Sequence, residues 1–352
     1  MILTSARLQN FRSYSDSSFE FEPGVNIIVG PNASGKTNLL DALYLTATGV
    51  TIRPNKDFLI QTNKPWSRLD VLTSQNQIRI TRIRQDNKPE FEFDDKKFRR
   101  FTLDKLIPVV LFEPNHLYQI TTAPEQRRQF MDDILTKIDP SFSSLKNNYI
   151  RTLRQRNSLL KLPLGEVKKQ IFAWDVRLCE LAGSYVQKRK QLLEQINQNS
   201  SGVYSKIANQ KHQLLLVYES KIQAENYSST LLKTLQLKLE LDHMRGFTGY
   251  GPHRDDMSII IDNNDMRNVA SRGETRSILL TLKVIEARIL EGIYNQKPLL
   301  LLDDVFGELD GARRKSLIDF MSGCQTFITT TDADIIAHNF MVGTKPIYIT
   351  KE

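Results

Sequence analysis

Eight residues near the start of the chain have the types and spacing of a phosphate-binding loop. They read GPNASGKT and fit the pattern G-x-x-x-x-G-K-[ST]. Two glycines let the backbone curl so that its N–H groups point at phosphate oxygens, and a helix behind the loop adds its positive end. The lysine can reach the β- and γ-phosphates, and the threonine hydroxyl can ligate Mg²⁺. The candidate nucleotide-binding residues are therefore Gly30, Pro31, Asn32, Ala33, Ser34, Gly35, Lys36 and Thr37.

The residues on either side of this loop distinguish it from a glycine-rich turn that happens to hold a lysine. An apolar, β-branched run precedes it at residues 25–29 and predicts a buried strand. Apolar residues at helical spacing follow it from Leu39 to Tyr44. The order strand, loop, helix is the context that a phosphate-binding loop requires.

A pair of acidic residues far along the chain could supply the metal ligand and the general base that a nucleotide-hydrolysing site needs. Asp303 and Asp304 follow four leucines, which predict a buried parallel strand with the acids at its carboxyl end, where open α/β sheets place ligands. Asp303 would hold Mg²⁺ through water with Thr37, and Asp304 would polarise the attacking water. An acid pair can also end a strand by chance, but the loop in the same chain favours the functional interpretation. Lys36 and Asp303 must then lie side by side.

The segment Ser271-Arg272-Gly273-Glu274 resembles the signature sequence of ABC-type ATPases. Its candidate nucleotide-binding residues are Ser271, Gly273 and Glu274, because a serine hydroxyl and a glycine N–H at a helix N-terminus form an anion site. A plain helix cap would use the same residue types. In ABC ATPases the signature of one subunit faces the γ-phosphate held by the other. One loop and one signature per chain therefore imply a head-to-tail dimer with ATP between the subunits.

The strand and helix patterns divide the chain into α/β material at both ends and a helical middle. Strands are expected at residues 3–11, 18–21, 25–29, 107–112, 257–261, 326–330 and 347–350, with an antiparallel meander within 68–101. Helices are expected at 124–138, 141–161, 165–197, 226–243, 275–294 and 311–322, and residues 214–218 are strand-like. The prediction is a discontinuous ATP-binding lobe of residues 1–115 and 246–352, and a helical lobe of residues 116–245.

The composition is that of an ordinary soluble protein. The 352 residues are enough for one large domain or two ordinary ones, and 40% are hydrophobic and 25% charged. No apolar run approaches the ~18 residues of a membrane span, and the first residues lack a signal-peptide pattern. Cys179 and Cys324 form neither a C-x-x-C pair nor a disulfide framework. A cytoplasmic protein without a membrane partner is expected.

The positive charge is concentrated in the helical middle. The net charge is +8, and residues 116–245 alone hold 20 Lys and Arg against 12 Asp and Glu. A basic segment beside a nucleotide-binding module indicates a polyanionic partner such as DNA, although a solvated helical face would have the same composition. The candidate DNA contacts on the expected helices are Arg151, Arg154, Arg156, Lys168, Lys169, Lys188, Arg189 and Lys190.

Eight sequence blocks resemble the RecF family, whose ATPase head is similar to the heads of SMC proteins. They are LQNFRSY (8–14), GPNASGKTNLLDAL (30–43), VVLFEP (109–114), EQRRQFMD (125–132), GYGPHRDDM (249–257), SRGETR (271–276), LLLLDDVFGELD (299–310) and FITTTD (327–332). GPHRDD and LLDDVF-x-ELD are more specific than the phosphate loop, and the resemblance covers essentially the whole chain. It implies an α/β P-loop NTPase of ABC/SMC-head type with a helical insert forming a second lobe.

The resemblance also implies a function. The cofactors would be ATP and Mg²⁺, and the partners would be DNA (duplexes and single-strand/duplex junctions), a second copy of the chain, and the mediators RecR and RecO. ATP would close two heads around DNA, and slow, DNA-stimulated hydrolysis would open them. The protein would aid recombinase loading at single-stranded gaps, within DNA repair, replication, recombination and the SOS response.

Several positions take roles from the resemblance or depart from its pattern. Residues 307–310 would line the dimer interface. Arg53 would act on the triphosphate with the catalytic Lys36 and Asp304, or would be a solvated loop arginine. Thr331 and Asp332 stand where ABC proteins have a switch histidine, and Asn115-His116 stands where the family usually has an acid. Asp304 replaces the glutamate of most ABC ATPases, and its shorter reach suggests slow hydrolysis.

Two questions stay open at the level of sequence. The GPHRDD block could contact DNA, brace the helical insert or support the signature. The chain could also be an ATP-dimerised scaffold with negligible turnover or a transporter ATPase subunit; the basic insert and GPHRDD disfavour the transporter. ATP hydrolysis measured with and without duplex DNA separates these functions.

Overall fold

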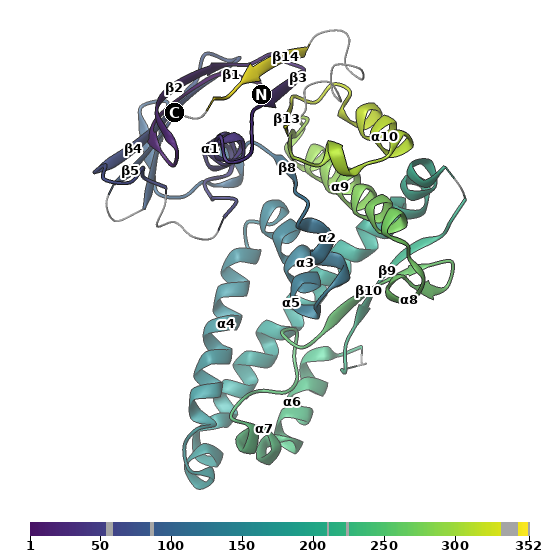
Figure 1. Ribbon diagram of the computed structural model, residues 1–352. Helices are drawn as coiled ribbons and strands as arrows, with labels where there is room; N and C mark the ends of the chain where they lie inside the picture. The colour runs from purple at the N-terminus through teal and green to yellow at the C-terminus, as the bar shows by residue number, and fades with distance from the viewer. Residues whose placement is uncertain (54–58, 85–87, 210, 223–224, 332–343, 351–352) are drawn as a thin grey trace. The chain divides into compact units, whose positions relative to one another are not determined.

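The chain forms two compact units, one of them discontinuous (Figure 1). A computed structural model describes residues 1–53, 59–84, 88–209, 211–222, 225–331 and 344–350. The α/β unit consists of residues 1–116 and 286–352, and the helical unit of residues 117–285. The second boundary therefore lies at 285/286 rather than at the predicted 245/246. Residues 246–285 stay with the helical unit because their main strand pairs there.

A parallel sheet forms one layer of the α/β unit. Within the described residues its strand order is β14 (Thr344–Tyr348), β3 (Val25–Val29), β13 (Thr326–Thr330), β12 (Leu299–Asp303) and β8 (Val109–Phe112). All four pairings are parallel, so the strands end at the same edge. The central strands are almost wholly buried, because both faces of a parallel sheet are covered.

A second, antiparallel sheet forms the other layer. Its order in the described part of the chain is β2 (Tyr14–Glu20), β1 (Leu3–Phe11), β4 (Trp66–Thr73), β5 (Ile78–Arg84), β6 (Pro89–Phe93) and β7 (Lys96–Phe98). The predicted meander is confirmed, and buried residues alternate along β4 and β5. The tight turn between β6 and β7 places Asp94 and Asp95 at φ 50° and 57°, as a two-residue hairpin requires. Part of the other predicted turn, residues 85–87, lies outside the described residues.

Helix α1 (Lys36–Thr48) lies between these two sheets and belongs to the same hydrophobic core (Figure 1). Its buried side chains come from all around the helix and include Leu39, Leu40, Leu43 and Leu45, which is the pattern of a fully enclosed helix. It ends at Gly49, which adopts φ 75°. Short helical turns lie at η2 (Leu103–Lys105) and η3 (Phe306–Glu308), and α10 spans Gly311–Met321.

The helical unit combines long helices with a small sheet. Its helices are α2 (His116–Thr121), α3 (Pro124–Ile138), α4 (Phe142–Leu159), α5 (Leu164–Ala208), α6 (Tyr227–Leu237), α7 (Leu239–Arg245) and α8 (Met266–Val269). Within the described residues its sheet has the order β11 (Asn264–Asp265), β10 (Asp256–Ile261) and β9 (Leu214–Glu219). The antiparallel pairing of β10 with β9 carries residues 246–285 into this unit. Helix α9 (Arg272–Tyr294) begins here and ends in the α/β unit.

Two helices of this unit differ from the predicted ones. Helix α5 continues to Ala208 because buried Ser200, Val203, Tyr204 and Ile207 extend its apolar stripe past Gly202. The helix expected at 226–243 is broken at Lys238 into α6 and α7. Among the described residues, no helix is long and apolar enough to cross a membrane.

Candidate functional site

The phosphate-loop pattern folds into a compact turn between β3 and α1. Gly35 adopts φ 106°, and a Cβ on Gly30 would come within 2.5 Å of the carbonyl oxygen of Ile349 and 2.6 Å of Ser34 Oγ. Both positions therefore require glycine. Ala33 also has a positive φ of 63°. The sequence pattern thus specifies the backbone path, and α1 begins directly behind it.

The side chain of Lys36 lies along this loop. Its Nζ donates to the carbonyl oxygens of Gly30 at 2.9 Å and Pro31 at 3.1 Å, and the residue is buried. An ammonium group held over the loop by two backbone acceptors is positioned to meet a phosphate there.

Thr37 and Asp303 meet at the carboxyl edge of the parallel sheet, as the sequence predicted for the two motifs. The Thr37 hydroxyl is 3.0 and 2.9 Å from the two carboxylate oxygens of Asp303. Thr329, at the end of neighbouring β13, donates its hydroxyl to Asp303 at 2.6 Å and accepts from the backbone N–H of Asp304 at 2.9 Å. Thr329 was not predicted; its register opposite Asp303 is the feature that identifies it.

The donor set at this edge fits Mg²⁺. A threonine hydroxyl and one carboxylate are the hard oxygen ligands that Mg²⁺ takes together with substrate phosphates. The described residues contain no cluster of three or more His, Cys, Asp or Glu, so a dedicated all-protein cage is not the arrangement found here.

Asp304 leaves the strand in an uncommon conformation. Its φ is 50°, in the left-handed region that non-glycine residues seldom adopt. Partial burial raises the pKa of the Asp304 carboxyl and nearby Asp303 adds to this, while Lys36 opposes it. A raised pKa makes a carboxylate a better proton acceptor.

A cavity of about 280 Å³ adjoins the phosphate loop. It is lined by Ser13, Tyr14, Ser17, Phe19, Ala33, Ser34, Tyr348, Ile349 and Thr350. The block LQNFRSY turns beside the loop, where Tyr14 donates its hydroxyl to the carbonyl oxygen of Gly35 at 2.9 Å. The block is part of the family resemblance, but its residues were not predicted to belong to the site.

Two other predicted positions are less enclosed. Arg53 is exposed at the end of the segment that follows α1. Thr331 is exposed just beyond β13, and Asp332 lies outside the described residues. At the end of β8, His116 Nδ1 accepts from the backbone N–H of Glu113 at 3.2 Å.

The ABC-like signature forms a capping box at the start of α9. The Ser271 hydroxyl accepts from the backbone N–H of Glu274 at 3.2 Å, and the Glu274 carboxylate accepts from the backbone N–H of Ser271 at 2.7 Å. The cap that the sequence left as an alternative is therefore present, and Ser271 is exposed. In the segment predicted for a dimer interface, Gly307 and Asp310 are exposed and Asp310 caps α10.

Two of the eight candidate DNA contacts are wrong. Arg156 and Arg189 are only 0% and 2% exposed. Arg156 pairs with Asp175 at 2.6 Å and Asp242 at 2.8 Å, and Arg189 pairs with Asp132 at 2.9 Å. Both arginines belong to the buried stripes of their helices, so their charge is neutralised inside the helical unit.

The other six candidates reach solvent to different degrees. Lys188 is half-buried and pairs with Asp139, and Lys168 pairs with Glu240 at 3.0 Å. The exposed candidates without an ion pair among the contacts of the described residues are Arg151, Arg154, Lys169 and Lys190.

We expect Arg156→Ala to destabilise the protein strongly. It would leave the buried carboxylates of Asp175 and Asp242 without their cation, and removing one partner of a buried ion pair costs about 3–5 kcal/mol. The measurement is the free energy of unfolding in urea. Arg154→Ala, two residues away on the exposed face of α4, is the control and should change it by less than about 0.5 kcal/mol. Equal, small effects of both substitutions would contradict this role of Arg156.

The GPHRDD block braces the helical unit. The Pro252 carbonyl accepts from Arg189 at 2.8 Å. His253 Nδ1 lies 2.6 Å from the Tyr149 hydroxyl, and burial lowers the pKa of this histidine to about 4. The Asp255 carboxylate accepts from the hydroxyls of Tyr218, Ser220 and Tyr227. Arg254 alone among the block's charged side chains is exposed, with its guanidinium over the Phe247 ring.

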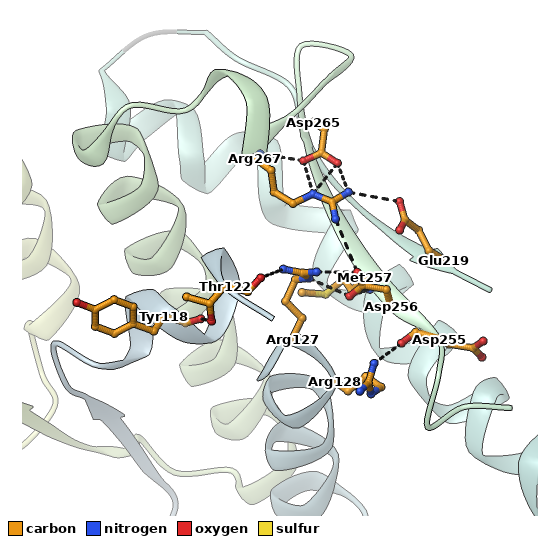
Figure 2. A network of polar contacts seen from close by, with 10 residues as sticks. All are labelled: Tyr118, Thr122, Arg127, Arg128, Glu219, Asp255, Asp256, Met257, Asp265 and Arg267. Carbon is orange, nitrogen blue, oxygen red and sulfur yellow. Dashed lines mark hydrogen bonds and ion pairs between the residues drawn. The ribbon is translucent and has the colours of Figure 1, made fainter. Parts of the chain in front are cut away.

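Figure 2 shows how the end of this block connects to neighbouring elements. Arg127 of α3 donates to the Asp256 carboxylate at 2.9 and 2.6 Å and to the Thr122 carbonyl at 3.2 Å. Arg267 of α8 reaches the same carboxylate at 3.7 Å, and Arg128 donates to the Asp255 carbonyl at 2.7 Å. Of the three roles left open for GPHRDD, bracing is the one these contacts demonstrate.

The fold and the loop define the class of protein. The described α/β layers with an inserted helical unit resemble an Smc head domain from Pyrococcus furiosus, at a TM-score of 0.54, 16% identity and coverage of 100% of this chain and 94% of that one. A model for an AAA domain matches residues 5–243. The chain has the P-loop fold of ABC/SMC-type heads and carries an AAA domain.

Closer similarity identifies the family. The chain is 33% identical over 347 residues to the "DNA replication and repair protein RecF" of Lachnoclostridium phytofermentans, covering 96% of this chain and 95% of the relative. A solved structure described as the recombination mediator protein RecF-ATPrS in the RecFOR pathway matches with a TM-score of 0.87 and 28% identity, covering 99% of this chain and 96% of that one. The chain belongs to the RecF family.

Proposed function

We propose that this protein is an ATP-dependent DNA-binding protein of recombinational repair and replication-fork maintenance. It dimerises on ATP, binds DNA and aids recombinase loading at single-stranded gaps, acting in the cytoplasm with RecR and RecO. The observation that carries the proposal is the meeting of Thr37 and Thr329 at Asp303, where each hydroxyl lies within 3.0 Å of the carboxylate.

ATP and Mg²⁺ are the ligands of this site in the proposal. Residues 30–37 bind the triphosphate through backbone N–H groups and Lys36. Thr37 and Asp303 would hold Mg²⁺, which would neutralise charge on the phosphates. The cavity beside Ala33 and Ser34 has room and an aromatic wall for the nucleoside. A similar solved structure is described as RecF-ATPrS, which favours ATP among the nucleotides.

Hydrolysis in this proposal is slow and depends on positioning. Water attacks the γ-phosphorus in line with the bond to the β-phosphate oxygen, and that bond breaks to release ADP. Asp304 orients the water and accepts its proton, while Lys36 and Arg53 stabilise charge on the transferring group. The short side chain of Asp304, with its shorter reach to the water, favours a low turnover.

The dimer is head-to-tail, with ATP between the loop of one subunit and the signature of the other. Ser271 is exposed at the N-terminus of α9, whose positive dipole end suits an anion, and Gly273 and Glu274 follow in the first turn. The capping box keeps that terminus ordered before any contact forms.

DNA binds through exposed basic side chains of the helical unit, mostly at phosphates and with little sequence preference. Arg151→Glu with Arg154→Glu should weaken duplex binding and flatten its salt dependence, because each lost phosphate contact removes about 0.9 from the slope of log K against log salt. These residues are better targets than Lys188, which pairs with Asp139.

The matched control is Lys96→Glu with Lys97→Glu, an equal change in charge on exposed β7 of the α/β unit. It should leave the slope unchanged. If the salt dependence of DNA binding has the same slope in both double variants and in the unmodified chain, the helical surface is a solvated face without a DNA role.

The experiment that tests the proposed function is ATP hydrolysis by the purified chain with and without duplex DNA. Stimulation by DNA supports the proposal. DNA binding with near-zero hydrolysis in both conditions would instead support an ATP-dimerised scaffold, the alternative that the short Asp304 side chain favours.

A further inference from the structure

Asp41 is a buried carboxylate at the centre of the α/β unit with no role assigned so far. It lies in α1, five residues after Lys36, and is 1% exposed. Aspartate is a poor residue for a helix interior, and burying a carboxylate is unfavourable unless it is paired. Burial raises the pKa of the Asp41 carboxyl, opposed first by Arg12 and then by the backbone N–H of Ile52.

The first partner of Asp41 is the turn that begins at Arg12. Arg12 Nε donates to one carboxylate oxygen at 2.7 Å, and a second guanidinium nitrogen forms an ion pair with it. Arg12 itself adopts φ 51°, a conformation that needs support from its surroundings. Asp41 therefore fixes both the direction and the backbone of this turn.

This turn lies directly against the phosphate loop. Ser13 Oγ accepts from Asn38 at 2.9 Å, and Tyr14 donates to the carbonyl oxygen of Gly35. A Cβ on Gly35 would come within 2.8 Å of Ser13 Oγ. Because the fit is so close, a shift of the turn by a few tenths of an ångström would reach the loop.

The second partner of Asp41 is the segment that carries Arg53. The other carboxylate oxygen accepts from the backbone N–H of Ile52 at 2.7 Å. One residue on, the Arg53 carbonyl accepts from the Thr51 hydroxyl at 2.7 Å. The charge of Arg53 also lowers the pKa of the Asp41 carboxyl, as the smallest of the influences on it. One carboxylate thus ties the turn beside the phosphate loop to the segment that carries Arg53.

We propose that Asp41 is a positioning residue that sets the Arg12 turn and Arg53 against the phosphate loop. This inference rests on the proposed function, because Arg53 must act on a bound triphosphate. Both carboxylate oxygens of Asp41 are engaged by Arg12 and Ile52, so the residue works through these partners. It acts through Arg53 on turnover and through the Arg12 turn on nucleotide affinity.

The test is a double-mutant cycle on steady-state ATP turnover, with Asp41→Asn, Arg53→Ala and the pair. Each single substitution should lower turnover about 10- to 100-fold, the loss expected when a catalytic group is misplaced by about 1 Å. If Asp41 works through Arg53, the pair should be no slower than Arg53→Ala by more than about twofold. Losses that multiply would overturn the proposal, since a merely structural role gives independent effects.

The control is Asp16→Asn, which removes the carboxylate of another Asp–Arg pair of the α/β unit, the exposed Arg7–Asp16 pair. It should leave turnover unchanged. If Asp41→Asn does not fold, a second variant is Arg12→Lys. It keeps a positive charge beside the Asp41 carboxylate but loses the contact made through two guanidinium nitrogens. It should then weaken binding of a fluorescent ATP analogue several-fold, and unchanged affinity would contradict the inference.

The unmodified chain separates the two proposals. If it neither binds nor hydrolyses ATP, the proposed function fails. If it does both and Asp41→Asn does so equally well, only the role of Asp41 fails.

Discussion

Lys36→Ala abolishes ATP-dependent dimerisation and lowers hydrolysis by about 10²–10³-fold, the effect of removing a group aimed at developing charge. The ammonium group lies over the loop on two carbonyl acceptors, and no other residue of the loop can replace its positive charge at the β- and γ-phosphates. Light scattering with and without ATP gives the dimer, and phosphate release gives the turnover. Normal dimerisation of Lys36→Ala would show that ATP is not held in this way.

Two further variants sharpen that experiment. Lys36→Arg should still bind ATP but fail to hydrolyse it, because a planar fork cannot replace a point charge. Lys297→Ala removes a cation of the same unit that donates to the Ser322 carbonyl at 3.2 Å, away from the loop. It should behave as the unmodified chain, so a loss there would indicate a general effect of charge.

Asp304→Asn should trap the ATP-bound dimer. The amide keeps the shape of the side chain but cannot accept the proton of the attacking water, and loss of a general base lowers turnover by about 10²–10⁴-fold. Because hydrolysis opens the dimer in this account, the dimer of Asp304→Asn should outlast that of the unmodified chain. The measurement is dimer lifetime after dilution into ATP-free buffer.

The neighbouring acid provides the control. Asp303→Asn removes the carboxylate that Thr37 and Thr329 share, so it should weaken Mg²⁺-dependent ATP binding and give no long-lived dimer. If the Asp304→Asn dimer instead dissociates at once, Asp304 is not the catalytic base, and its role is metal binding or structure.

The backbone of the loop and of the strand before Asp303 could be predicted from the sequence because each motif specifies its own conformation. The glycines at 30 and 35 and the four leucines before Asp303 leave few alternatives for the loop and the strand. The prediction that the two motifs meet is confirmed by the contact between Thr37 and Asp303. Thr329 could not be predicted, because its role depends on which strand lies beside β12.

Two of the candidate DNA contacts, Arg156 and Arg189, were wrongly predicted from charge. Arg156 follows Tyr149 and Thr152 at helical spacing, and all three are buried on one side of α4. Arg189 likewise follows Leu178, Ala182 and Tyr185 on the buried side of α5. This periodicity was visible in the sequence, but the carboxylates that neutralise the two arginines come from distant segments. A prediction based on charge alone therefore placed both arginines on the surface, although they are buried.

The predicted position of the second boundary between the units differs from the structure for a similar reason. Residues 246–285 carry strand and turn signals like those of the α/β ends, so local pattern assigned them there. The pairing of β10 with β9 and the contacts of GPHRDD with α3, α4 and α5 decide otherwise. Such long-range pairings are specified by complementary surfaces rather than by any local signal.

The most direct test of the account is ATP turnover by a mixture of two inactive variants. Lys36→Ala spoils the phosphate loop, and Ser271→Arg spoils the signature by blocking its exposed helix N-terminus. Each alone should be inactive. In a head-to-tail, two-fold dimer, a mixed pair restores one complete site from the loop of one chain and the signature of the other, so the mixture should recover up to about a quarter of the unmodified turnover. A mixture as inactive as its two components would contradict a nucleotide shared between subunits.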